Sequence, residues 1–292
     1  MMWFRSNGRA LFPSGAGHVA PLLTLMIFAF DIPIAMMLAI SVAPDFTFAN
    51  YGRLIETPVY LRVVGNTLWV AAITTAVCVI AGYPLAYWMY RLPARGLSVA
   101  LSLIVMSFWV SVLVRTYAWI VALGNGGILN RALLALHLLG SPIRFLYSEP
   151  GVIIGMSNIL IPYMVLPLFA AMVRVDERLL HAAASLGASD RTIFWRIFFP
   201  LTVPAACAGA ILVFVSAAGF FVSPAILGGG RVPMLANLLD ILINQNPRWE
   251  LAAAISTVLL AASVACYALY RRHVHVVVDI SKMPRVGETA GR

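Results

Sequence analysis

Long stretches without a charged residue divide this chain of 292 residues. Five of them contain no Asp, Glu, Lys or Arg, and a sixth, 19–43, is apolar apart from Asp31. A helix needs roughly 20 apolar residues to cross the hydrocarbon core of a bilayer, and each stretch is about that long or longer. The pattern therefore predicts six transmembrane helices, near residues 19–43, 63–90, 97–123, 150–173, 201–223 and 250–270.

The first and fifth stretches need separate interpretation. The fifth, 197–230, is longer than one crossing, and Pro224 with the glycines at 228–230 predicts that its helix ends there. The first follows Arg5 and Arg9, as a signal peptide would. Its apolar part is about 25 residues long, however, against roughly 7–15 in a cleaved signal. We interpret it as an uncleaved membrane anchor.

Composition agrees with a membrane protein. Hydrophobic residues make up 62% of the chain and charged residues 11%, with a mean hydropathy of +0.92, whereas soluble domains carry about 25% charged residues. The predicted fold class is all-α: a polytopic membrane protein with one transmembrane domain at 19–270. Residues 1–18 and 271–292 are expected to form cytoplasmic tails.

The basic residues predict the orientation. With the N-terminus inside, 13 of the 20 basic residues fall in cytoplasmic segments, six fall in outer loops, and Arg115 lies in the third span. Such a bias is typical of the cytoplasmic side of a membrane protein. Both termini are thus expected on the cytoplasmic side of a bacterial inner membrane. The bias also accounts for the net charge of +9 without a nucleic-acid partner.

The chain lacks the residue patterns of enzyme chemistry. Its only lysine, Lys282, lies near the C-terminus outside any Gly-rich phosphate-binding motif, so ATP hydrolysis of the P-loop kind must occur on another chain. No serine stands in a Gly-x-Ser-x-Gly turn, and we expect no catalytic residue. We also expect no metal or cofactor, since His273 and His275 are interpreted as part of a solvated tail.

The loop between the fourth and fifth spans, 174–200, carries the clearest local signals. Asp176 is placed to cap a short helix that ends at Gly187, because glycine takes the left-handed conformation without a Cβ clash. Ser189 is placed to cap a second short helix, with Asp190 in its first turn, an apolar stripe that includes Phe194, and Pro200 as its boundary. By itself this pattern indicates an amphipathic loop on the cytoplasmic face.

The spacing in this loop resembles the EAA loop of ABC importer permeases, which reads Glu-Ala-Ala, three residues, Gly, nine residues, Ile-x-Leu-Pro. Here the residues are His181-Ala182-Ala183, Gly187 and 197–200. His181 replaces the acidic residue, and phenylalanine replaces leucine at position 199. The resemblance implies that the loop docks on a cytoplasmic ATPase, through the residues His181, Ala182, Ala183, Gly187, Asp190, Arg191, Phe194 and Pro200.

The chain is similar to the spermidine/putrescine permease subfamily at residues 114–120, 127–130, 139–140, 142–144 and 161–167. This resemblance implies a chain that forms half of a translocation pathway. The implied partners are ABC ATPase subunits, a second permease, homologous or identical, and an extracytoplasmic solute-binding protein. A polyamine is the implied substrate, with an opine, an amino-acid derivative or a phosphonate as alternatives.

Ionisable groups within membrane spans are costly and are therefore functional candidates. Asp31 and Arg115 are the two such groups here. Arg115 is also compatible with pairing, or with snorkelling to the outer interface. Aromatic faces attract organic cations, and the candidates are Trp109, Tyr117, Trp119 and Phe220, which are equally compatible with core or interface positions.

Two other classes of protein remain open from the residues alone. A secondary transporter driven by an ion gradient would need acidic residues within its spans, and Asp31 is the single candidate. An intramembrane enzyme would need paired carboxylates or a nucleophile with its base, and neither is present.

Overall fold

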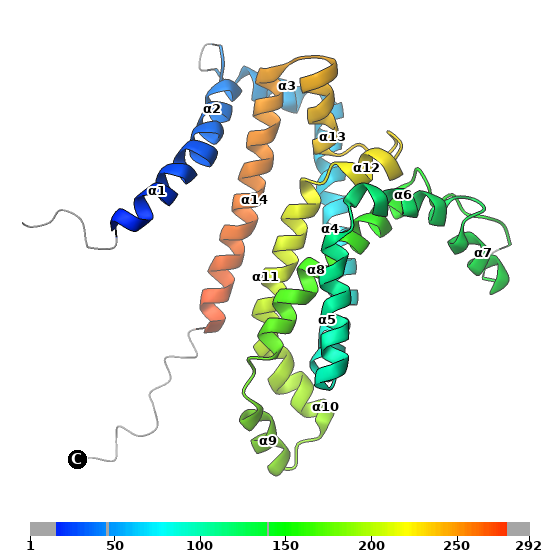
Figure 1. Cartoon of the computed structure of the whole chain (residues 1–292). Helices are drawn as coiled ribbons and strands as arrows, with labels where there is room; N and C mark the ends of the chain where they lie inside the picture. The colour runs from blue at the N-terminus through cyan, green and yellow to red at the C-terminus, as the bar shows by residue number, and fades with distance from the viewer. Residues whose placement is uncertain (1–15, 45–46, 139, 279–292) are drawn as a thin grey trace, which may run out of the picture.

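The computed structural model describes residues 16–44, 47–138 and 140–278. The described residues form helices and connecting turns without a β-strand (Figure 1). The elements are α1 Ala16–Met26, η1 Ile27–Asp31, α2 Ile32–Ser41, α3 Ala49–Glu56, α4 Pro58–Tyr90, α5 Ala94–Trp109, α6 Val112–Leu123, α7 Ile128–Ala135, α8 Glu149–Met172, α9 Glu177–Ser185, α10 Asp190–Ile193, η2 Phe194–Phe198, α11 Phe199–Ala218, α12 Val222–Leu227, α13 Leu235–Asp240, η3 Ile241–Gln245 and α14 Trp249–Val278. The three η segments are π-helical turns.

The centre of the molecule is a three-helix core of α4, α8 and α11. Met164 of α8 is fully buried there and lies against glycines of both neighbouring helices. A Cβ atom at Gly82 of α4 would lie 2.9 Å from Met164 Cγ, and one at Gly209 of α11 would lie 2.8 Å from Met164 Sδ. Small residues at helix crossings let backbones approach closely in membranes, which explains these contacts.

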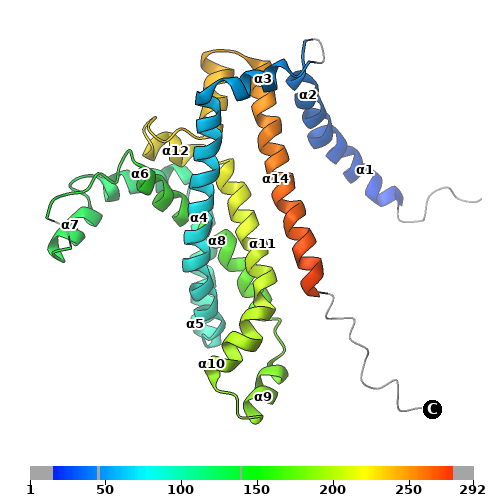
Figure 2. The same ribbon diagram turned by 180° about the vertical axis from the view of Figure 1, so that it is seen from behind.

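The first helix stands partly apart from this core. α2 packs along α14, whereas α1 diverges from it (Figures 1 and 2). The π-turn η1 ends two residues before Pro33, and η2 ends two residues before Pro200. Proline lacks an N–H and crowds the carbonyl of the preceding turn. A π-turn widens the helix by one residue and so lets it continue past the proline.

The third predicted span is not one helix. The sequence predicted a helix over 97–123, but the chain is extended at Val110 and Ser111, so that α5 and α6 are separate. α5 runs beside the core, and α6 with α7 turns away from it (Figure 1). α5 has 16 residues, or about 24 Å at 1.5 Å per residue. This is shorter than a bilayer core of about 30 Å.

The fifth predicted span, 201–223, differs at both ends. The helix ends at Ala218, before Gly219, and the short helix α12 follows. At its start Pro200 is not a boundary, because α10, η2 and α11 form one continuous helix from Asp190 to Ala218. The remaining predicted spans match helices within a few residues, apart from extensions at the start of α4 and the end of α14.

Six segments of the described chain are long and apolar enough to cross a membrane. They are Pro21–Ser41, Pro58–Tyr90, Val112–Ala135, Glu149–Met172, Asp190–Ala218 and Trp249–Ala268. The third joins α6 and α7 across a turn, and α5 is a shorter apolar helix beside it. The predicted class, an all-α polytopic membrane protein with about six spans, is confirmed.

Candidate functional site

The loop after α8 begins with a capped helix and a closed glycine turn. The Asp176 carboxylate accepts a hydrogen bond of 2.9 Å from the Arg178 N–H at the start of α9. Gly187 has a φ of +85°, and its N–H donates to Ala184 O at 2.9 Å while the Ala188 N–H donates to Ala183 O at 3.1 Å. This pair of bonds is a Schellman motif, which needs a left-handed residue at the glycine position.

The second short helix is capped by Ser189, whose hydroxyl oxygen accepts from the Thr192 N–H at 3.4 Å. Asp190 lies in the first turn, where the helix dipole favours negative charge. Because α10 continues through η2 into α11, one unbroken helix joins the loop to the three-helix core.

Aromatic side chains attach this second helix to the end of α4. The Phe194 and Phe198 rings lie 5.0 and 5.4 Å from the Tyr87 ring centroid, both in edge-on geometry. Phe198 also lies 5.2 Å from Tyr90. One turn further into the core, the Tyr83 hydroxyl and Thr202 Oγ1 are 2.7 Å apart, within hydrogen-bonding distance. Aromatic pairs of this kind add stability beyond their buried area, so α4 and the loop are held together.

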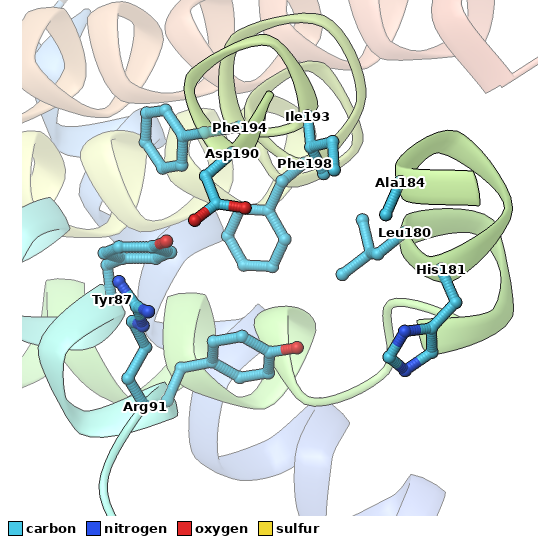
Figure 3. A pocket seen from close by; sticks show the side chains of 10 residues that line it. Tyr87, Arg91, Leu180, His181, Ala184, Asp190, Ile193, Phe194 and Phe198 are labelled. Atoms are coloured by element: carbon cyan, nitrogen blue, oxygen red, sulfur yellow. The ribbon is translucent and has the colours of Figure 1, made fainter. Parts of the chain in front are cut away.

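A groove of about 360 Å³ lies between α9, the second short helix and the end of α4 (Figure 3). Its lining residues are Tyr87, Tyr90, Arg91, Leu180, His181, Ala184, Asp190, Ile193, Phe194 and Phe198. His181 and Ala184 lie on the α9 side, whereas Tyr87 comes from α4 and Arg91 directly follows it. The Arg91 guanidinium also lies 5.8 Å from the Tyr87 ring centroid, in the range of a cation–π contact.

The structure brings the predicted coupling residues to one end of the molecule (Figures 1 and 2). Phe194 is half-buried in the aromatic cluster, and Ala183 is half-buried on α9. The remaining residues are exposed, namely His181, Ala182, Gly187, Asp190, Arg191 and Pro200.

Sequence reasoning missed Leu186, which is 90% exposed at the tip of the loop. An apolar residue directly before the turn glycine was the available signal. It also missed Tyr87, Tyr90 and Arg91, whose position beside the loop depends on the packing of α4.

Four of the six candidate pathway residues border the two helix breaks, whereas Trp119 packs against the three-helix core. Trp109 ends α5 and is 86% exposed, Tyr117 is exposed on α6, and Phe220 lies between α11 and α12. The breaks are neighbours, because Thr116 Oγ1 and Ser223 Oγ lie 3.3 Å apart across α6 and α12. Discontinuous helices in transporters often border the substrate site, so this region is the candidate pathway.

Arg115 spans the first of these breaks. Its Nη1 donates to Ser107 Oγ of α5 at 3.2 Å, and its Nε is buried without a hydrogen-bond partner among the described residues. The guanidinium is therefore held at the break between α5 and α6.

Asp31 lies apart from this region. It is exposed in the first helix, beside the segment that packs on α14. A pathway role for Asp31 stays a prediction. Within the described part of the chain, no cluster of three or more metal-ligating side chains occurs.

The fold and the loop define a class, the membrane-spanning subunits of ABC transporters. One solved structure with this fold is a bacterial alginate ABC transporter in complex with a pentasaccharide-bound periplasmic protein, which aligns with a TM-score of 0.75 at 16% identity over 92% of this chain and 95% of that one. No protein-family model matches the chain.

Curated relatives define the class more narrowly. The spermidine/putrescine transport system permease protein PotB of Haemophilus influenzae is 38% identical over 263 residues, covering 85% of this chain and 91% of the relative. PotB of Escherichia coli K12 is 37% identical over 214 residues, 73% of this chain and 78% of the relative. The chain belongs to the PotB family of ABC transporter permeases.

Membership of this family decides between the classes that the residues left open. The chain is a multi-pass inner-membrane protein and a transport subunit. Its relatives are permeases rather than enzymes or ion-driven transporters.

Proposed function

We propose that this chain is one permease subunit of a polyamine importer, in which it forms half of the translocation pathway. The curated relatives named above carry spermidine/putrescine names, and the chain aligns with nearly the full length of one of them. The pathway residues of the proposal are Trp109, Arg115, Tyr117 and Phe220 beside the helix breaks.

Coupling to a cytoplasmic ATPase is proposed for the loop 174–200. This proposal is supported by the connection between the loop and the core. The exposed tip at Leu186 and Gly187 leads through a short turn into the continuous helix Asp190–Ala218. Closure of an ATPase dimer around this tip would move α11 and, through the aromatic cluster, α4. A rigid element that shifts as a unit is a recognised means of transmitting such a change.

The proposed assembly contains two permease subunits, two ATPase subunits and an external solute-binding protein. In it the coupling loop and both termini face the cytoplasm, because the basic residues favour that side. The ATPase supplies the hydrolysis that this chain lacks.

The assembly can be tested by reconstitution. The chain is expressed with the ATPase and second permease from neighbouring open reading frames, purified through its own tag, and reconstituted with the binding protein. We expect the ATPase to copurify and spermidine uptake to require both ATP and binding protein. Copurification without uptake of spermidine or putrescine would reject the polyamine, and absence of any bound ATPase would reject the coupling role.

A further inference from the structure

Trp69 of α4 and Glu149 of α8 form a hydrogen-bonded pair that belongs neither to the coupling loop nor to the helix breaks. The Trp69 indole N–H donates to Glu149 Oε1 at 2.6 Å, between two helices of the core. The indole is nevertheless 57% exposed. An exposed ring is thus fixed beside a carboxylate on the surface that α4 and α8 share.

The Glu149 carboxylate has no cationic partner among the residues that the structure describes. Within the described part of the chain, the Trp69 indole is the single hydrogen-bond or ion-pair partner of the Glu149 side chain. Glu149 stands in the first turn of α8, where the helix dipole favours it. Its side chain nevertheless reaches across to α4. One carboxylate oxygen therefore remains available to a ligand.

The depth of the pair along the helices points to the outer mouth of the pathway. α8 begins at Glu149, whereas α4 begins at Pro58, about 11 residues or roughly 16 Å before Trp69. From Trp69 to the coupling-loop end at Tyr90, α4 runs about 21 residues, roughly 32 Å, which is close to the thickness of the hydrocarbon core. With Tyr90 at the inner surface of the bilayer, this length would place the pair where α4 emerges on the side opposite the loop.

A third polar side chain lies on the same face of α4. Asn66 precedes Trp69 by one helical turn and donates to Pro233 O at 2.8 Å. This bond holds the segment between α12 and α13 against α4, next to the pair. The surface around the pair is thus formed by α4, α8 and the chain that follows the broken fifth span.

We propose that Trp69 and Glu149 form an ammonium-binding station at this outer mouth, which receives a primary ammonium group of the cargo as it leaves the binding protein. A carboxylate accepts charge-assisted hydrogen bonds from an ammonium group, and an indole face attracts the same cation. The indole N–H fixes the orientation of the carboxylate. The proposal rests on the polyamine function above and assigns its first contact in this subunit.

The test compares Glu149→Gln with Glu149→Asp in the complete reconstituted complex. Glutamine keeps an acceptor for the indole N–H but removes the charge, whereas aspartate keeps the charge. We expect Glu149→Gln to lower spermidine uptake per ATP hydrolysed about tenfold, the loss of one hydrogen bond to a charged group. Binding-protein-stimulated ATPase activity and copurification should stay at the wild-type level. Glu149→Asp should retain most of the uptake.

The aromatic half is tested with Trp69→Phe and Trp69→Leu. Phenylalanine keeps a ring face and should retain more uptake than leucine. Matched controls are Glu250→Gln and Trp249→Phe, because Glu250 also lies in the first turn of an outer-end helix and Trp249 is 56% exposed. Glu250 shares a groove with Arg53 and Arg248, and we expect neither control to change uptake per ATP.

The outcomes separate this proposal from the function it rests on. A wild-type complex that takes up spermidine, with an equally active Glu149→Gln variant, overturns the ammonium station and leaves the polyamine function intact. Equal loss of assembly in Glu149→Gln and Glu149→Asp assigns the pair a structural role and also overturns it. If the wild-type complex transports no polyamine, the proposed function itself fails.

Discussion

Gly187 shows how one backbone conformation supports the coupling loop. Its φ of +85° closes the Schellman turn after α9, and nothing lies within 4 Å of the position that a Cβ would occupy. A side chain there would meet no neighbour within this chain. Its cost is the left-handed conformation itself, of order 1–2 kcal/mol for a residue with a Cβ, together with any crowding of a docked partner.

Gly187→Val is expected to abolish uptake and to weaken copurification of the ATPase, while the protein still inserts into the membrane. Gly230→Val is the matched control, since Gly230 has a φ of +75° and equally open surroundings in the loop after α12. Quantitative copurification of both variants checks this prediction. Similar losses in the two variants would mean that backbone strain, rather than the partner, is responsible.

His181 lines the groove that also contains Arg91. A glutamate at this position, the residue of the EAA pattern, would place a negative charge in the same groove as the guanidinium. We expect His181→Glu to copurify the ATPase and transport at least as well as the wild type, because the opposite charges attract. His181→Lys is the contrasting variant. Stronger ATPase copurification and faster transport with lysine than with glutamate would contradict the expectation that a negative charge is favoured beside Arg91.

At the scale of elements, Pro200 lies within a continuous helix, although a proline usually marks the end of one. Pro200 was expected to end the second short helix, yet the helix continues to Ala218. The π-turn η2 shifts the hydrogen bond of the Phe199 N–H to Phe194 O, which accommodates the proline in the next turn. The coupling loop and the fifth span are consequently one mechanical unit.

Helix packing at the core yields a stability prediction. Gly82→Leu should lower the thermal stability of the purified protein, since overpacking against Met164 costs typically 1–3 kcal/mol. Gly65→Leu is a control on the same helix, because nothing lies within 4 Å of its Cβ position, and the gain in helix propensity is the same for both changes. Thermal unfolding in detergent measures the difference, and equal midpoints would argue against close packing at Gly82.

The whole molecule has a polar loop at one end and the α3 and α13 segments at the other (Figures 1 and 2). With the coupling loop inside, six crossings would place both termini inside as well, which is the orientation that we propose. A cytoplasmic reporter fused after Arg292 should be active, and alkaline phosphatase fused there should be inactive. Fusion after Gly230, in the segment between α12 and α13, should give the reverse pattern. Phosphatase activity after Arg292 would contradict a cytoplasmic C-terminus.

Much of this architecture follows from the sequence because it depends on local interactions. Apolar stretches specify crossings through the length that a bilayer requires, as in α4, α8 and α14. Asp176, Gly187 and Ser189 specify their turns through bonds to backbone groups only a few residues away. The spacing of the loop residues indicated an ABC importer permease, and other short segments, such as residues 114–120 and 161–167, indicated the spermidine/putrescine subfamily.

The tertiary structure decided the features that depend on distant partners. The chain breaks at Val110 and Ser111 without a proline or glycine, where α6 turns from α5 to pack on α12 and α8. The groove at His181 requires Tyr87 and Arg91, about 90 residues earlier in the chain. Trp69 and Glu149 are 80 positions apart. Such contacts form because whole helices pack together, and no local pattern encodes which faces will meet.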